Sequence, residues 1–324
     1  MRAVQITETG GPEVMGVVDV PVPEPGPGQV RIEVAAAGLN FIDTYFRSGT
    51  YPGKLPMGIG HECAGTVSAV GDGVDGLAVG DAVVTAGTRG AYAEHCLAPA
   101  EQVFTLPDGI DLEVAAASAL QGLTAHYLVR STFPLAEGHR CLIHAGAGGV
   151  GGLLIQMAKM IGAEVFTTVG TAEKAEIARA HGADHVINYR EADFVEAVKA
   201  EVGDGPGLDV VYDGVGKDTF DGSLAVLRPR GMMALFGGSS GQVPPFDLQR
   251  LNAGGSLFVT RPSLGHYMAP PEGQQRVDEL YGWIASGELE VAIGGRYPMA
   301  EAAEAHRALE GRQTTGKILI LPEG

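Results

Sequence analysis

A glycine-rich segment, Ala145-Gly146-Ala147-Gly148-Gly149-Val150-Gly151, is the strongest candidate for binding chemistry in this 324-residue sequence. It follows a short apolar run and precedes apolar residues that are spaced as on one face of a helix, from Val150 to Ile161. Small residues let the backbone approach a pyrophosphate, and a helix N-terminus offers free N–H donors. The strand–loop–helix context therefore predicts a dinucleotide site rather than a tight turn that binds nothing.

The end of the next predicted strand bears on which dinucleotide binds. A site specific for NAD places Asp or Glu there, where the carboxylate holds the ribose hydroxyls. Here the strand ends Thr168-Val169-Gly170-Thr171, Lys174 follows on the next helix, and Tyr189-Arg190 follow the third strand. Lys174 alone or Arg190 alone would be interpreted as an ordinary solvated charge. Together with the missing carboxylate they favour the 2′-phosphate of NADPH.

Strands and helices alternate from about Arg140 to Phe236, which predicts right-handed βαβ units and a parallel sheet covered on both faces. We expect strands at 141–145, 164–169, 185–189, 208–213 and 232–236, and helices at 150–161, 172–181, 191–202 and 218–227. Two glycine-containing segments, 213–216 and 236–241, would then follow carboxyl ends of strands. They either line the nicotinamide ribose or form plain turns.

The residues before this region predict a different kind of domain. Short alternating runs at 29–34, 65–71 and 80–84 are separated by Gly and Pro, which favours an irregular, mostly antiparallel β domain. After about residue 261 we expect helices at 274–286 and 300–310 and a closing strand at 317–321.

Composition excludes several function classes. With 22 Lys and Arg against 39 Asp and Glu, the net charge of −17 disfavours partners such as nucleic acid or an anionic membrane. The three cysteines are widely spaced without a CxxC pair, which suits a reducing compartment. Neither a signal peptide nor an apolar run of membrane-helix length is apparent, so we expect a cytoplasmic enzyme.

Segments along essentially the whole chain carry a family resemblance. They are Asn40–Tyr45, Arg47–Gly49 with Tyr51-Pro52, Gly122–Thr124, Ala147–Gly151, Gly170–Ala172 with Lys174, Val186–Arg190, Val210–Asp213, Val259–Leu264 and Arg312. Together they resemble the zinc-independent quinone oxidoreductases, including the zeta-crystallin type, of the medium-chain dehydrogenase/reductase superfamily. The NFIDTY and VTRPSL segments make the resemblance specific to this branch.

The resemblance implies an α/β fold with two domains. A chaperonin-10-like, mostly β substrate domain would comprise residues 1–125 and 263–324. A Rossmann domain with a doubly wound parallel sheet would comprise residues 126–262 and bind NADPH. The resemblance also implies a cleft between the domains and a homodimer formed through the Rossmann domain.

The resemblance further implies roles for individual residues. Lys174, Tyr189 and Arg312 would bind the 2′-phosphate region, and Val150 and Gly151 would lie beneath the pyrophosphate. The full set of expected cofactor-binding residues is Asn40, Thr124, Gly148, Val150, Gly151, Gly170, Thr171, Lys174, Tyr189, Phe236, Gly237, Ser239, Arg261, Ser263 and Arg312.

Three residues, Asn40, Tyr45 and Tyr51, would line the substrate pocket and are the candidate catalytic residues. Both tyrosines could flank a flat ring and donate a hydrogen bond to a developing oxyanion. Equally, they could be packing aromatics in a loop.

The segment Gly60-His61-Glu62 departs from this branch and is similar to a motif of zinc alcohol dehydrogenases. A catalytic zinc needs three protein ligands. Asn40 stands where those enzymes have Cys, and Leu120-Gln121 stand near the third ligand. We therefore expect no metal and interpret His61 as structural, with an adventitious metal site at His61 and Cys63 as the weaker alternative.

The function expected from these residues is hydride transfer from NADPH to a quinone, without a metal. One alternative is NADPH-dependent reduction of activated C=C bonds in enones or alkenals. Another is NADPH binding without useful turnover.

Overall fold

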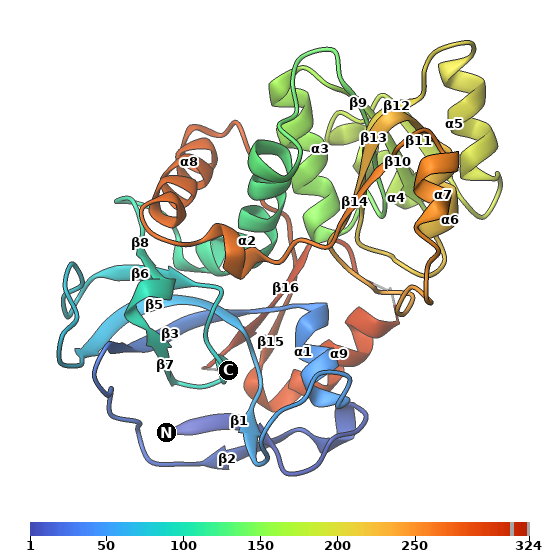
Figure 1. Ribbon diagram of the computed structural model, residues 1–324. Coiled ribbons are helices and arrows are strands. Elements are labelled where there is room, and N and C mark those ends of the chain that lie inside the picture. Colours follow the sequence, from blue (N-terminus) through green and yellow to red (C-terminus); the bar gives the residue numbers. More distant parts are fainter. Residues whose placement is uncertain (312–313, 323–324) are drawn as a thin grey trace. The chain divides into compact units, whose positions relative to one another are not determined.

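The computed structural model describes residues 1–311 and 314–322 and contains two compact units (Figure 1). One unit comprises Met1–Leu123 together with Tyr267–Gly324, and the other comprises Thr124–His266. Within the described residues, no helix is long and apolar enough to cross a membrane. Arg312, one of the expected cofactor contacts, lies outside the described residues.

The unit Thr124–His266 contains a six-stranded parallel sheet with the order β11-β10-β9-β12-β13-β14. Its strands are β9 (Arg140–Ile143), β10 (Glu164–Val169), β11 (His185–Asn188), β12 (Leu208–Asp213), β13 (Leu227–Leu235) and β14 (Phe258–Thr260). Its helices include α3 (Gly149–Ile161), α4 (Ala172–Ala180), α5 (Phe194–Val202), α6 (Phe220–Ala225) and α7 (Gln249–Ala253). Strand order reverses between β9 and β12, which is the doubly wound arrangement expected from the alternation of elements.

Local sequence explains where several of these elements begin and end. Helix α3 buries Leu153, Leu154 and Met157 on its apolar face and ends at Gly162, whose φ of 89° is left-handed. Helix α5 begins three residues later than predicted, because the Asp193 carboxylate accepts hydrogen bonds from the first-turn amides and fixes the N-cap there.

The other unit is mostly β. Its larger sheet has the order β15-β16-β3-β5-β6-β8, and β7 also pairs with β3. These strands are β3 (Gln29–Leu39), β5 (Glu62–Val70), β6 (Ala82–Thr85), β7 (His95–Pro99), β8 (Val103–Thr105), β15 (Ile293–Pro298) and β16 (Lys317–Leu321). A small sheet joins β1 (Arg2–Ile6), β2 (Gly16–Asp19) and β4 (Met57–Gly58). The closing strand β16 pairs antiparallel with β3, so residues far apart in the sequence lie side by side.

Two helices in the first 127 residues were not predicted, namely α1 (Phe41–Arg47) and α2 (Leu112–Tyr127). The later helices of this unit are α8 (Glu272–Ser286) and α9 (Ala302–Glu310). Helix α1 is only two turns long, and its first turn depends on the Asp43 carboxylate, which accepts the Asn40 backbone N–H at 2.8 Å. Strand β3 extends five residues beyond the predicted end at residue 34, which places Asn40 directly after the strand.

Candidate active site and family

The glycine-rich loop has the geometry of an anion-binding turn. Ala145 adopts a left-handed φ of 58°, and the chain then enters α3 through Gly148. A Cβ on Gly146 would overlap Thr167 Oγ1, and a Cβ on Gly151 would overlap the Ala145 carbonyl oxygen. The N-cap residue of α3 is Gly148, which has no side chain that could accept from the N–H groups of the first turn. Such a turn can hold a pyrophosphate against the helix N-terminus.

A buried polar network beneath this loop ties three strand ends together. His144 Nδ1 lies 2.9 Å from Thr168 Oγ1 and His144 Nε2 lies 3.0 Å from Ser223 Oγ, while Ser223 donates to Asp213 Oδ2 at 2.9 Å. Burial lowers the pKa of His144, although the charge of Asp213 opposes this. Because Ser223 donates to the carboxylate, its oxygen accepts from Nε2–H of a neutral His144. The network therefore holds the ends of β9, β10 and β12 in register around the loop.

Several expected cofactor contacts gather at the ends of β10 and β11. Gly170 follows β10, and Thr171 caps α4 by accepting the Lys174 backbone N–H at 3.3 Å. The Tyr189 amide donates to the Val169 carbonyl at 3.0 Å, and a Cβ on Gly170 would meet Tyr189 Oη. Tyr189 is nevertheless 46% exposed, so this residue is accessible to a ligand.

Other expected contacts follow the far strands of the same sheet. Phe236, Gly237 and Ser239 follow β13, and the Phe236 and Ser239 amides donate to the carbonyls of Asp213 and Gly214 at 2.9 and 3.2 Å. The two glycine-containing segments are thus paired through their backbones. Arg261 and Ser263, which follow β14, are exposed, whereas Thr124 is buried on α2.

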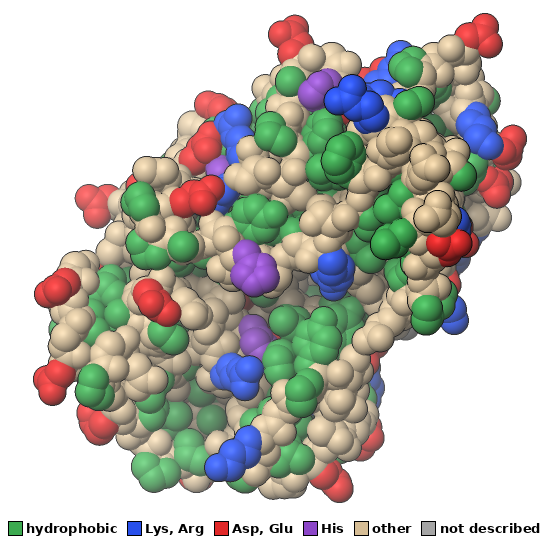
Figure 2. Space-filling model, viewed as in Figure 1, with side chains coloured by type: hydrophobic (Ala, Val, Ile, Leu, Met, Phe, Trp, Pro, Cys, Tyr) green, Lys and Arg blue, Asp and Glu red, His purple; other side chains and the backbone are tan. Residues whose placement is uncertain are grey.

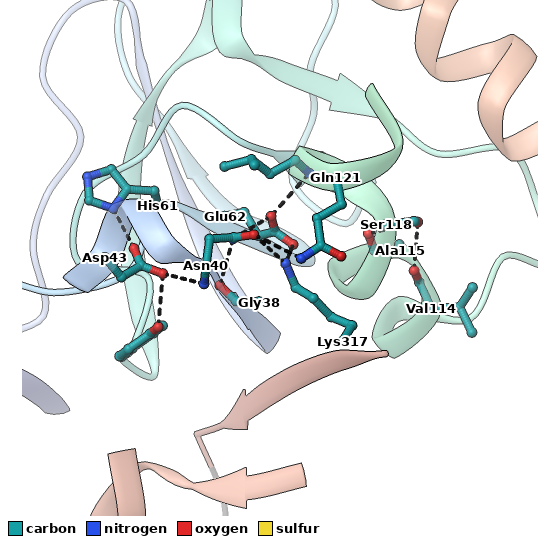
Figure 3. Close-up of polar contacts among 12 residues, drawn as sticks. Gly38, Asn40, Asp43, His61, Glu62, Val114, Ala115, Ser118, Gln121 and Lys317 are labelled. Atoms are coloured by element: carbon teal, nitrogen blue, oxygen red, sulfur yellow. Dashed lines mark hydrogen bonds and ion pairs between the residues drawn. The ribbon is translucent and has the colours of Figure 1, made fainter. Parts of the chain in front are cut away.

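Asn40 lies at the centre of a buried polar cluster in the mostly β unit (Figure 3). Its Nδ2 donates to Glu62 Oε2 at 2.8 Å and to the Gly38 carbonyl at 3.3 Å. Its Oδ1 accepts from Lys317 Nζ at 2.8 Å and from Gln121 Nε2 at 3.3 Å. Both hydrogens and both lone pairs of the amide are therefore engaged within the protein.

The charges in this cluster are a buried ion pair. Lys317 Nζ lies 2.8 Å from Glu62 Oε1, and the two side chains are 1% and 0% exposed. Burial raises the pKa of Glu62 despite the attraction of Lys317, and burial likewise lowers the pKa of Lys317 despite the attraction of Glu62. Desolvation thus outweighs the mutual attraction, which indicates that this pair fixes geometry rather than adding stability.

The same cluster argues against a catalytic zinc. The Asn40 amide oxygen faces the Lys317 ammonium, which would repel a metal cation at this position. Gln121 is already hydrogen-bonded to Asn40. Across residues 1–311 and 314–322, no group of three or more His, Cys, Asp and Glu side chains is placed to hold a metal ion. The residues present do not fit the three-ligand site that a zinc dehydrogenase needs.

His61 is held by a buried carboxylate instead. His61 Nδ1 lies 2.6 Å from Asp43 Oδ1, and Tyr92 donates to Asp43 Oδ2 at 3.0 Å. Burial would raise the pKa of Asp43, but the hydrogen bond and charge of His61 and the charge of His306 reverse this and lower it. An ionised carboxylate only accepts hydrogen bonds, so Nδ1 of His61 carries a proton.

The two candidate tyrosines form an aromatic cluster, with Tyr45 on α1 and Tyr51 in the segment that follows it. The rings of Tyr45 and Tyr51 are 5.3 Å apart at an interplanar angle of 64°, and Tyr51 also packs edge-on against Phe46 at 5.5 Å. Both tyrosines are half-buried. This packing is compatible with both roles considered for the tyrosines, which are to flank a flat substrate ring or to pack as structural aromatics.

The sequence did not single out the residues that hold Asn40 and His61 in place. Asp43 lies only three positions from Asn40, whereas Gln121 and Lys317 take part because distant segments meet, at 81 and 277 positions from Asn40. His144 directly precedes the glycine-rich loop, and this position was the one available signal for the network under that loop.

Comparison with known proteins places these features in a family. Residues 26–108 match the alcohol dehydrogenase GroES-like domain, and residues 149–272 match the zinc-binding dehydrogenase domain. The chain is 47% identical to a quinone oxidoreductase of Pseudomonas aeruginosa, with 99% of each chain covered. It is 43% identical to a 2-haloacrylate reductase of a Burkholderia species, with 100% of this chain and 99% of that protein covered.

A solved structure of Escherichia coli quinone oxidoreductase complexed with NADPH superposes with a TM-score of 0.96 at 45% identity. The match covers 99% of this chain and 100% of that chain. Full-length similarity at this level, together with the two domain matches, shows that the chain belongs to the quinone oxidoreductase branch of the medium-chain dehydrogenase/reductase superfamily.

Proposed function

We propose that this protein transfers a hydride from NADPH to a quinone without using a metal ion. The observation that carries the proposal is the uncapped N-terminus of α3 behind the turn at Ala145. Gly170, Lys174 and Tyr189 gather at the ends of the neighbouring strands of the same sheet. The NADPH-bound relative of the same fold supports this choice of cofactor.

Each part of the site has a proposed task. The first-turn amides of α3 bind the pyrophosphate, with Val150 and Gly151 beneath it. Lys174 and Tyr189 bind the 2′-phosphate region, and the segments at Phe236 and Arg261 border the nicotinamide half. NADPH, when bound, supplies the hydride. A quinone needs little activation because its reduced product is aromatic, so ring orientation by Tyr45 and Tyr51 would suffice.

Asn40 has a narrower role in this proposal than direct hydrogen bonding to substrate. All of its amide hydrogen-bonding capacity is used by Gly38, Glu62, Gln121 and Lys317. We propose that Asn40 borders the pocket as a rigid wall. Its rigidity comes from the buried ion pair behind it.

Lys174→Ala is expected to weaken NADPH binding by about 10- to 100-fold and to leave NADH binding unchanged. A hydrogen bond to a charged group contributes about 1.5–3 kcal/mol, and only NADPH carries the 2′-phosphate. Titration of cofactor fluorescence measures both affinities. Lys199→Ala, which removes an exposed cation that pairs with Glu196 on α5, is the matched control. An equal loss for both cofactors would show that Lys174 does not bind the 2′-phosphate.

A second candidate function is the reduction of an activated C=C bond, which the similarity to a 2-haloacrylate reductase favours. The two functions share a fold and a cofactor site, so initial rates with a quinone and with an enone distinguish them. A higher kcat/KM for the quinone supports the proposed function. NADPH binding with no oxidation by either acceptor would instead support a non-catalytic binding protein.

We further propose a homodimer that acts in the cytoplasm. Strand β14 is at the edge of the parallel sheet, and its Phe258 and Val259 are 54% and 37% exposed. Exposed apolar side chains on an edge strand suit pairing with a second copy. The three free cysteines suit a reducing compartment. Light scattering tests the assembly, and a monomer at micromolar concentration would refute it.

A further inference from the structure

A cavity of about 380 Å³ lies within the mostly β unit, and its lining includes none of the residues assigned to NADPH or to the quinone. Its walls include Phe46, Lys54, Met57, His61, Arg89 and His95, and its lining contains no Asp or Glu. Elsewhere the chain is strongly acidic, with a net charge of −17, and acidic side chains are spread over the face shown in Figure 2. The cavity is thus a locally basic site in an acidic protein.

Two cations at this cavity have no protein anion to neutralise them. Arg89 and Lys54 are both exposed, and within the described part of the chain neither forms an ion pair. The Arg89 guanidinium lies 5.1 Å from the centroid of the Phe46 ring, which holds it against an aromatic wall. Phe46 is itself stacked on His61, with centroids 4.6 Å apart and an interplanar angle of 22°. A planar guanidinium in this position can bind a carboxylate through two parallel hydrogen bonds.

Two imidazole nitrogens on the same walls also lack partners. His61 Nε2 and His95 Nδ1 are buried and have no hydrogen-bond partner among the described residues. Buried polar atoms in native proteins are nearly always hydrogen-bonded, so each unpaired one calls for an explanation. Both nitrogens belong to residues that line one cavity, and a ligand with hydrogen-bonding oxygens would supply partners for them.

We propose that this cavity binds a flat organic acid, with Arg89 and Lys54 binding its carboxylate. Phe46 would contact the ligand ring, and the imidazoles of His61 and His95 would hydrogen-bond oxygens of the acid. Tyr51 packs against Phe46, so the cavity adjoins the aromatic pair expected at the substrate pocket. Binding of the acid at this cavity does not depend on the proposed function. A role of the acid as the hydride acceptor rests on that function.

Calorimetric titration of the full chain with 2-naphthoate and with neutral 2-naphthamide tests this site without turnover. The wild type is expected to bind 2-naphthoate about tenfold more tightly than the amide, because a charge-assisted pair adds to the ring contacts. Arg89→Met and Lys54→Met should each reduce 2-naphthoate affinity about five- to tenfold and change 2-naphthamide affinity less than twofold. Arg307→Met is the matched control, since this exposed arginine of α9 lies outside the cavity lining.

Equal affinity for acid and amide would overturn the proposal. The proposal would also be overturned if Arg89→Met and Lys54→Met lost no more 2-naphthoate affinity than Arg307→Met does. The overall charge of the protein would then explain the binding. NADPH oxidation by neutral 1,4-naphthoquinone, measured on the same samples, tests the proposed function separately. Activity with this quinone but no preference for 2-naphthoate would leave the function standing and remove the acid site.

Discussion

Lys317→Met is expected to lower the free energy of unfolding by about 3–5 kcal/mol, the usual cost of removing one partner of a buried ion pair. The substitution leaves the Glu62 carboxylate without its counterion and removes one of the two hydrogen bonds to Asn40 Oδ1. Glu62 is 0% exposed, so water cannot replace the lost ammonium. Urea unfolding followed by circular dichroism measures the loss.

A double variant separates the charge from the packing. Glu62→Gln together with Lys317→Met removes both charges and keeps an acceptor for the Asn40 amide. We expect it to recover most of the lost stability, because the raised pKa of Glu62 and the lowered pKa of Lys317 show that desolvation exceeds attraction. If the double variant is less stable than Lys317→Met, the ion pair stabilises the fold and our account of its role is wrong.

Gly151→Ala is expected to weaken NADPH binding by about 10- to 100-fold. A Cβ at this position overlaps the Ala145 carbonyl oxygen, and backbone atoms cannot move aside as a flexible side chain can. Relieving such overpacking costs about 1–3 kcal/mol and moves the first turn of α3 away from the loop. Equilibrium titration with NADPH measures the change.

The control for this substitution lies in another helix. Gly282 of α8 has open space where a Cβ would be, so Gly282→Ala makes the same chemical change without a clash. It should leave NADPH affinity unchanged and raise stability slightly, since Ala favours a helix over Gly by about 0.5–1 kcal/mol. If Gly151→Ala binds NADPH as tightly as the wild type does, binding of the pyrophosphate does not depend on this turn.

The parts of the fold that depend on neighbouring residues could be predicted from the sequence. Strands β10 and β12 have the predicted bounds, and α3 begins one residue before the predicted start. Apolar runs and the spacing of apolar residues are local signals that can be read from neighbouring residues. Helix α1 could not be predicted, because two turns are too short to show a periodic pattern. Its start is set by the hydrogen bond from the Asn40 backbone N–H to the Asp43 carboxylate. Helix α2 lies in a region that was interpreted as irregular β structure, and it carries Gln121.

The polar cluster around Asn40 could not be predicted, because its members meet only through sheet pairing. Strand β16 brings Lys317 beside the end of β3, and β5 brings Glu62 to the same place. A lysine that opens an apolar strand looks like a solvated end residue in the sequence, yet here it is 1% exposed. The sequence shows that Asn40 stands where zinc dehydrogenases have Cys, but it does not show the Lys317 cation that faces Asn40.

Metal-free hydride transfer from NADPH to a quinone is measured as the rate at which chelator-treated protein oxidises NADPH and NADH with 1,4-benzoquinone. Our account predicts rapid oxidation of NADPH, a much lower kcat/KM with NADH, and no loss of activity after metal removal. Activity that disappears with the metal, or that is seen only with NADH, would contradict the account.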